Sequence, residues 1–142
     1  MPANEVFIDT TALMAIVNRA DVLHPSAVAL NRQFAASNTP LVTSDWVLAE
    51  FLCGASRPSV RSNASNIVSA LRSSSRTIIV EATRADWERA FTFFCDHHDK
   101  SWSLIDCTSM LICGDRGIQR VFTYDHHFRQ FGLSVLLRND GI

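Results

Sequence analysis

Lysine is almost missing from this sequence of 142 residues. Lys100 is the only one, so twelve of the thirteen cationic side chains are arginine, whose planar guanidinium suits bidentate contacts with phosphate. An excess of positive charge is also missing. The formal net charge is −1, which excludes a bulk electrostatic attraction for nucleic acid. The arginine bias is compatible with a phosphate-bearing substrate, and a codon bias of the source genome would produce the same count.

The sequence has no zinc-binding or redox pattern of cysteines. None of its four cysteines belongs to a Cys-x-x-Cys pair, so we expect reduced side chains that pack in the interior: Cys53, Cys95, Cys107 and Cys113. No apolar run is long enough to span a membrane, and the first five residues lack the basic and apolar regions of a signal peptide. We therefore expect a cytoplasmic protein that does not contact a membrane.

Length and composition indicate one globular domain over residues 1–142. With 47% hydrophobic and 19% charged residues, the chain is large enough and apolar enough to form a full core. It contains no internal repeat and no linker.

Short apolar runs alternate with segments of helical periodicity along the whole chain. The predicted strands are residues 5–9, 40–43, 76–80, 119–125 and 133–137. The predicted helices are residues 10–17, 26–36, 46–53, 58–71, 85–95 and 104–114, the last ending between 114 and 117, with a turn or short helix over 126–132. This alternation predicts an α/β fold, in which a five-stranded, mostly parallel sheet is covered by helices on both faces.

Hydroxyl and carboxyl residues stand where several of these helices begin. Ser44 or Asp45 can cap the third helix, Thr83 the fifth, and Ser101 or Ser103 the sixth. A cap alone does not explain the acid at position 106, which lies one turn inside an apolar helix. We therefore expect a positive partner near this carboxylate.

Four of the fourteen acidic residues have unusual surroundings. Asp9 and Asp125 end predicted strands, whereas Glu50 and Asp106 lie inside apolar helices. Because parallel strands end at one edge of a sheet, the four carboxylates should converge there. They would repel one another and raise their own pKa values unless a cation lay among them. Oxygen ligands without cysteine or histidine favour Mg²⁺ or Mn²⁺ over zinc.

The four acids stand in four characteristic segments, in this order: Val6–Thr11, Thr43–Glu50, Asp99–Cys107 and Val121–Phe128. Together these segments resemble the PIN-domain ribonucleases, in particular the VapC-like toxins of bacterial toxin–antitoxin pairs. The resemblance covers essentially the whole chain and implies a three-layer PIN-like fold. Thr10 replaces the serine often found there in the family and keeps the hydroxyl group.

The resemblance implies that metal binding and catalysis belong to the four acids: Asp9, Glu50, Asp106 and Asp125. Thr123 would orient Asp125 from the strand, and Thr10 and Ser103 would support the site. Asp99 is either an outer ligand or a turn residue before Ser101.

The implied activity is cleavage of RNA by an endoribonuclease that depends on Mg²⁺ or Mn²⁺ and leaves 5′-phosphate and 3′-hydroxyl ends. The implied partners are a second copy of the chain and a small antitoxin. The antitoxin would insert a segment into a groove near the acids and place an arginine among them.

Three further residues are interpreted as substrate contacts. Arg57 and Arg61 follow the helix of Glu50 and could reach phosphates, and Trp102 precedes the helix of Asp106. The alternatives are solvated arginines and a packed aromatic ring. We do not expect the histidine pairs at 97–98 and 126–127 to chelate a metal ion, since neighbouring residues on a helix do not face the same side. His126 follows Asp125 closely enough to touch substrate and is interpreted as a solvated turn residue.

Other interpretations remain open for the acids and for the chain. Asp9 could cap a helix, and Glu50 or Asp106 could pair with a buried arginine. The chain could be a stand-alone RNA-processing nuclease or a catalytically silent module that binds RNA or protein. A haloacid-dehalogenase-type phosphatase would need a second aspartate where Thr11 stands.

Overall fold

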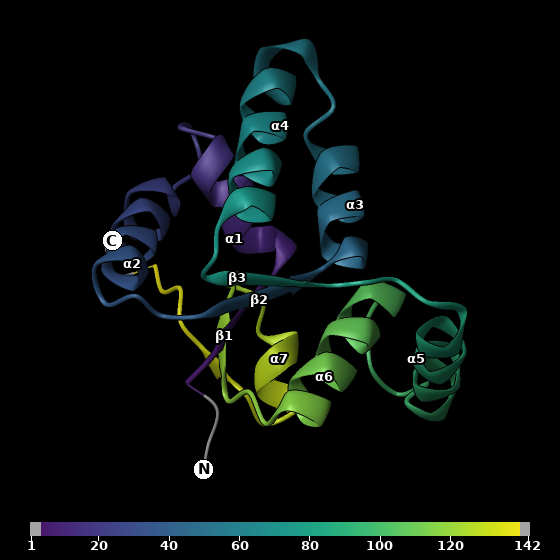
Figure 1. Ribbon diagram of the computed structural model, residues 1–142. Helices are drawn as coiled ribbons and strands as arrows, with labels where there is room; N and C mark the ends of the chain where they lie inside the picture. The colour runs from purple at the N-terminus through teal and green to yellow at the C-terminus, as the bar shows by residue number, and fades with distance from the viewer. Residues whose placement is uncertain (1–3, 140–142) are drawn as a thin grey trace.

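The computed structural model describes residues 4–139 and shows a three-layer arrangement of helices around one sheet (Figure 1). The strands are β1 (Val6–Ile8), β2 (Leu41–Ser44), β3 (Thr77–Val80), β4 (Arg120–Phe122) and β5 (Ser134–Val135). Their order is β3-β2-β1-β4-β5, and every pair is parallel. The predicted fold class is confirmed, and the sheet is parallel throughout.

Seven helices in the described residues connect these strands. They are α1 (Thr10–Val17), α2 (His24–Ala36), α3 (Asp45–Gly54), α4 (Pro58–Ser73), α5 (Arg84–Asp96), α6 (Leu104–Arg116) and α7 (His127–Gln130). In Figure 1, α1, α3 and α4 lie on one side of the sheet, and α5, α6 and α7 lie on the other. Helix α2 begins earlier than predicted, because Pro25 fits the first turn of a helix. Across residues 4–139, no helix has the length and apolarity needed to cross a membrane.

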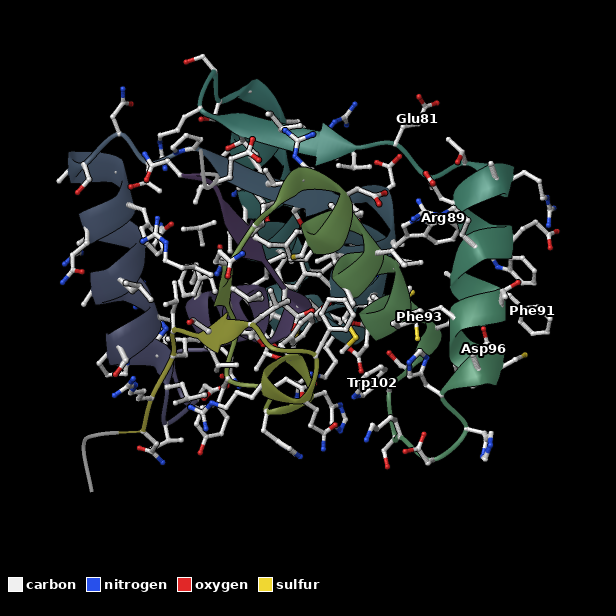
Figure 2. The ribbon with its side chains drawn as sticks, turned by 90° about the horizontal axis from the view of Figure 1, so that it is seen from below. Glu81, Arg89, Phe91, Phe93, Asp96 and Trp102 are labelled. Atoms are coloured by element: carbon white, nitrogen blue, oxygen red, sulfur yellow. The ribbon has the colours of Figure 1, made fainter. Side chains whose placement is uncertain are left out.

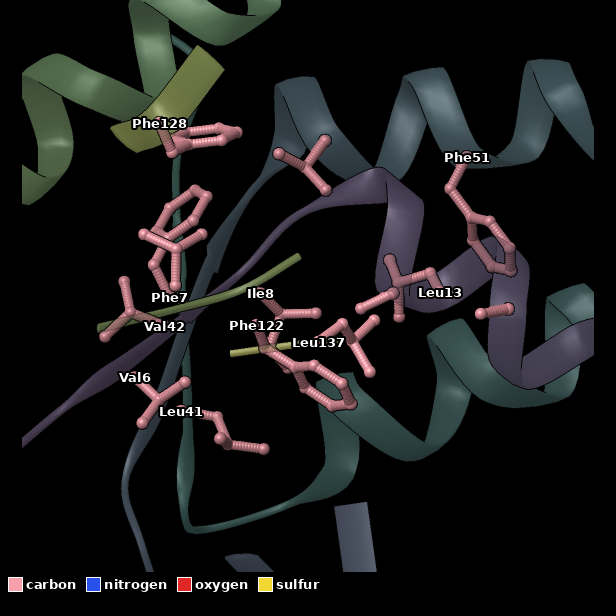
Figure 3. Packing of buried hydrophobic residues seen from close by; sticks show 14 of the residues in the cluster. Val6, Phe7, Ile8, Leu13, Leu41, Val42, Phe51, Phe122, Phe128 and Leu137 are labelled. Carbon is pink, nitrogen blue, oxygen red and sulfur yellow. The ribbon is translucent and has the colours of Figure 1, made fainter. Parts of the chain in front are cut away.

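The core lies on both faces of the central strands. Every residue of β1 and β2 is buried, since helices cover both faces and no alternation with polar residues is needed. Figure 3 shows the apolar side chains packed around these strands, including Phe7, Phe122 and Phe128, each with 0% exposure. The edge strand β3 is only partly buried. The acid that follows β1 is therefore supported by the most deeply buried strands of the sheet.

The helix ends confirm most of the capping predictions. Ser44 caps α3 and Thr83 caps α5, each accepting a backbone N–H with its side chain, while Asp45 is the first helical residue. Helix α6 ends at Gly117, whose φ of 69° is the left-handed conformation that favours glycine.

The interior role predicted for all four cysteines is right for two of them. Cys107 and Cys113 are buried in α6, and burial raises the pKa of both thiols, to about 11 and about 12. Cys53 and Cys95 are exposed, because they lie on the outer faces of α3 and α5. The packing prediction is wrong for this second pair.

Phe7→Ala is expected to lower the free energy of unfolding by about 3–5 kcal/mol, because loss of a fully buried ring leaves a cavity. The matched control is Phe91→Ala in α5, which removes a ring that is 46% exposed. This variant should lose less than about 1 kcal/mol. Urea denaturation followed by circular dichroism measures both values. Equal losses in the two variants would contradict the packing described above.

Candidate active site

The paired strands β1 and β4 bring two of the predicted acids to one edge of the sheet. Ile8 lies opposite Phe122 in the register, and each strand runs on into an acid, Asp9 directly and Asp125 three residues later. Asp106 lies in the first turn of α6 and Glu50 in α3. The four acids therefore come from four separate parts of the chain.

Asp9 is the most buried of the four acids, with 3% exposure. Its Oδ2 accepts hydrogen bonds from the hydroxyl groups of Thr123, at 2.9 Å, and Thr11, at 3.2 Å. Burial raises the pKa of the Asp9 carboxyl from 3.8 to about 6. The Thr123 hydrogen bond opposes this shift, and the charges of Asp106 and Glu50 add to it. Without a cation, Asp9 is thus partly protonated near neutral pH.

Asp106 has a local structural role that its position alone did not suggest. It is the third residue of α6, and its Oδ2 accepts the backbone N–H of Ser103 at 3.0 Å. The Ser103 hydroxyl in turn accepts the N–H of Asp106 at 3.0 Å, which completes a capping box. The expectation that a cap does not explain this acid is therefore wrong. Burial raises the pKa of Asp106 and the Asp125 charge raises it further, so the carboxylate still lacks full compensation.

Glu50 joins the site through the residue after Asp9. The hydroxyl of Thr10 donates a hydrogen bond to Glu50 Oε1 at 2.5 Å, across the contact between α1 and α3. The charge of Glu50 contributes to the raised pKa of Asp9. Thr10 thus holds the Glu50 carboxylate on the Asp9 side of the cluster.

Thr123 connects two acids with one hydroxyl group. Its Oγ1 donates to Asp9 Oδ2 and accepts the backbone N–H of Asp125 at 3.0 Å. The orientation of Asp125 by Thr123 was predicted, and the structure places this contact on the backbone of Asp125. The contact with Asp9 was not foreseen.

His127 is part of the site, although the sequence analysis assigned it no role. Its Nδ1 lies 3.3 Å from Asp106 Oδ2 and 3.2 Å from Asp125 Oδ1. The backbone N–H of His127 also donates to Asp125 Oδ1 at 2.9 Å. An aspartate side chain that accepts the backbone N–H of the residue two positions later forms a common turn. The spacing between Asp125 and His127 is therefore the sequence signal from which this backbone contact can be expected.

The structure does not bring Asp99 or the two arginines into this cluster. Asp99 is exposed and pairs with Lys100 at 3.3 Å, which lowers the pKa of its carboxyl. Arg57 and Arg61 are exposed at the turn between α3 and α4, the end of this hairpin that lies farthest from the sheet in Figure 1. Arg61 donates to the backbone oxygen of Ser56 at 2.9 Å.

Trp102 has a packing role rather than an open face. It is 6% exposed, and its ring is stacked on Phe93 of α5 with the centroids 5.8 Å apart. In Figure 2, Phe93 and Trp102 lie on the side of α5 that faces α6, and Phe91 points to the opposite side of α5. The Trp102 indole N–H donates to Gln130 Oε1 at 2.8 Å, which ties the start of α6 to α7. Trp102 is therefore a packed aromatic ring, which the sequence analysis gave as the alternative to a substrate contact.

The donor set fits a divalent cation. Within residues 4–139, no lysine or arginine forms an ion pair with Asp9, Glu50, Asp106 or Asp125, so the structure gives no support to a structural ion pair. Ligand atoms of Asp106, Asp125 and His127 all lie within 4.8 Å of one another. Within the described residues, Asp9 and Asp106 are buried carboxylates with raised pKa values and no lysine or arginine paired to them, and a bound metal ion would stabilise their charged forms.

Comparisons with known proteins point to one family. The PIN domain family model matches residues 6–133. The 23S rRNA-specific endonuclease VapC20, found in two strains of Mycobacterium tuberculosis, is 30% identical over 135 residues, covering 89% of this chain and 94% of the relative. The crystal structure of M. tuberculosis VapC20, described as a sarcin–ricin loop cleaving toxin, matches with a TM-score of 0.79 at 25% identity. That match covers 94% of this chain and 99% of VapC20.

Asp9→Asn is expected to stabilise the metal-free protein at pH 7.5. The folded pKa of Asp9, about 6, lies above its ordinary 3.8, so the stability from this group is lost as the pH rises from about 4 through 6. The difference between the two pKa values corresponds to a cost of about 3 kcal/mol for ionised Asp9 in the folded protein. The neutral amide of asparagine avoids this cost. Urea denaturation in EDTA measures the free energy of unfolding of both proteins.

At pH 7.5 the free energy of unfolding of Asp9→Asn should exceed that of the wild type, and this difference should shrink by about 2 kcal/mol when the pH is lowered to 4.5. Asp96→Asn, at an exposed position in α5, is the control and should follow the wild type at both pH values. An advantage of Asp9→Asn that stays constant with pH would argue against buried charge at this position.

Proposed function

This chain belongs to the PIN-domain family, and from that premise we propose that it is a metal-dependent endoribonuclease acting as the toxin of a toxin–antitoxin pair. The similarity to VapC20 over nearly the full length of both chains supports the endoribonuclease activity. The observation that carries the proposal is the convergence of Asp9 after β1, Asp106 in the first turn of α6 and Asp125 beyond β4, with no lysine or arginine paired to them among the described residues.

The chemistry follows from what each side chain offers. A bound Mg²⁺ or Mn²⁺ would lower the pKa of a water molecule and stabilise charge on a phosphodiester oxygen. Asp9, Asp106 and Asp125 would hold the ion. Glu50, which accepts a hydrogen bond from the Thr10 hydroxyl, lies on the side of the acidic cluster where Asp9 is. Thr123 and Ser103 keep two of these carboxylates in place through hydrogen bonds of 2.9 and 3.0 Å. In this proposal the protein contributes to catalysis mainly by positioning the metal ion and the substrate and by supplying negatively charged ligands.

The substrate we propose is RNA of the large ribosomal subunit. The relatives are described as specific for 23S rRNA and as cleaving the sarcin–ricin loop, and this chain matches them along nearly their whole length. Arg57 and Arg61, which are exposed beyond the end of the Glu50 helix, are proposed to contact phosphates there. A loop is a suitable target, since its bases are exposed in single-stranded form.

A groove between α1, α2 and α4 suits the antitoxin. Here the term α1–α4 groove means the surface lined by Leu13, Ile16, Ile67 and Leu71 at its apolar part and by Arg19, Arg32 and Arg76 at its polar part. It begins beside Ile8, the residue before Asp9. The described lining contains no acidic residue, so a segment with apolar and acidic side chains would complement it. We propose that the antitoxin docks there.

The family resemblance supports two further proposals, on the oligomeric state and on the location of the protein in the cell. We propose that the chain forms a homodimer, which light scattering on the purified protein would test. We also propose that it works in the cytoplasm, where ribosomal RNA and an antitoxin would both be available.

Asp9→Asn and Asp106→Asn are each expected to reduce RNA cleavage by at least about 100-fold, because each removes a charged ligand while keeping its hydrogen bonds. Asp99→Asn is the matched control and should keep activity near that of the wild type, since its carboxylate faces solvent. Purified ribosomes or a sarcin–ricin loop oligonucleotide are incubated with each protein, with and without EDTA. Sequencing of the cleaved ends then locates the cut. Metal-dependent cleavage that survives both substitutions would refute the assignment.

Ile67→Glu is expected to weaken antitoxin binding by at least about tenfold, since it places a charge in the apolar part of the α1–α4 groove. Val22→Glu, at a side chain that is 68% exposed, is the control and should bind normally. The toxin is co-expressed with the small protein encoded beside it, and the affinity is measured by calorimetry. Equal binding by both variants would place the antitoxin elsewhere.

A further inference from the structure

His127 occupies a position among the acids that its sequence context did not indicate. It lies at the start of α7, two residues after Asp125, and its side chain is 21% exposed. Its Nδ1 approaches one oxygen of Asp106 at 3.3 Å and one of Asp125 at 3.2 Å. Two carboxylates therefore meet at one nitrogen atom.

These distances match those between neighbouring ligands of one metal ion. In an octahedral site with ligand distances of about 2.1 Å, adjacent donor atoms lie about 3 Å apart. The donor atoms of Asp106, Asp125 and His127 are all within 4.8 Å of one another. One ion can thus be reached by both carboxylates and the imidazole after small side-chain movements.

The surrounding structure holds the imidazole in this place. Phe128, the next residue, is completely buried in the core, and Gln130 accepts the Trp102 indole N–H at 2.8 Å. Both contacts anchor α7 against the body of the protein, close to the start of α6. The ring of His127 is therefore held beside Asp106 by α7 as well as by its contact with the two carboxylates.

We propose that His127 is a direct metal ligand through Nδ1, and that the site therefore prefers Mn²⁺ to Mg²⁺. This rests on the proposed metal-dependent function and deepens it. Imidazole nitrogen binds transition-metal ions well, whereas Mg²⁺ prefers a shell made of oxygen atoms. The oxygen-only donor set expected from the sequence is thereby replaced by a mixed set of nitrogen and oxygen.

A different role for His127 predicts different behaviour. If Nδ1–H only donates hydrogen bonds to Asp106 and Asp125, the ion is bound by oxygen alone and the preference for Mn²⁺ does not depend on the ring. The neighbouring His126 offers a natural control, since it is exposed and its ring lies 4.8 Å from that of His127. No described hydrogen bond or ion pair joins the His126 side chain to an acid of the site.

The test measures metal binding directly in the full chain. Mn²⁺ and Mg²⁺ affinities are determined by calorimetry, and pulsed electron paramagnetic resonance of bound Mn²⁺ detects a coordinated nitrogen. The variants are His127→Asn, which offers an amide oxygen near the place of Nδ1, His127→Ala, and the control His126→Ala. Circular dichroism confirms that each variant is folded.

The wild type and His126→Ala should bind Mn²⁺ at least about tenfold more tightly than Mg²⁺ and show the nitrogen coupling. Both His127 variants should lose this coupling, and His127→Asn should lose most of the preference. Mn²⁺ bound to the wild type without nitrogen coupling, or coupling that persists in His127→Ala, overturns the role of His127 and leaves the proposed nuclease site intact. If neither ion binds the wild type, the proposed metal site fails as well.

Discussion

The site depends on negative charge that the fold places at the neighbouring ends of β1 and β4. Asp9 is almost fully buried there, and burial raises the pKa of its carboxyl to about 6. Hydrogen-bond donors such as the Thr123 hydroxyl and the Ser103 N–H favour the ionised forms of Asp9 and Asp106, whereas the charges of the neighbouring carboxylates oppose them. These donors reduce the cost of burial and do not cancel it, since both pKa values remain raised.

The rest of the fold can be understood as support for that arrangement. An all-parallel sheet brings the carboxyl ends of β1 and β4 together, and the crossover helices begin from the same edge. The side chains that fix the strands, such as Phe7 and Phe122, are fully buried, so the backbone before each acid has little freedom. On the other side of the site, Phe128 and the Trp102–Gln130 hydrogen bond fix α7. Rigid elements therefore surround charges that would otherwise move apart.

The sequence predicted the parts of this structure that depend on local patterns. Short, mainly apolar runs identified β1 and β2, and hydroxyl residues before apolar periodicity identified the caps at Ser44 and Thr83. Glu50 and Asp106 were singled out because a charged residue in an apolar helix needs a compensating partner, and Asp9 and Asp125 because they end predicted strands.

What the sequence did not predict depends on contacts between distant segments. The burial of Trp102 requires Phe93 and Gln130, which come from α5 and α7. The approach of His127 to Asp106 spans 21 residues and depends on how α7 packs beside α6. The exposure of Cys53 and Cys95 depends on which helix faces remain uncovered, and a cysteine count does not contain that information.

Stability and activity are opposed at this site for a physical reason. The charges that the proposed chemistry needs are those that burial disfavours in the metal-free fold at neutral pH, so an amide in place of Asp9 should favour folding and would remove a proposed ligand. A cation that binds only the folded chain adds stability in proportion to the logarithm of its concentration over its dissociation constant. The folded state and the metal-loaded state are therefore linked. A metal ion bound by the buried carboxylates would thus contribute to the stability of the fold as well as to the proposed reaction.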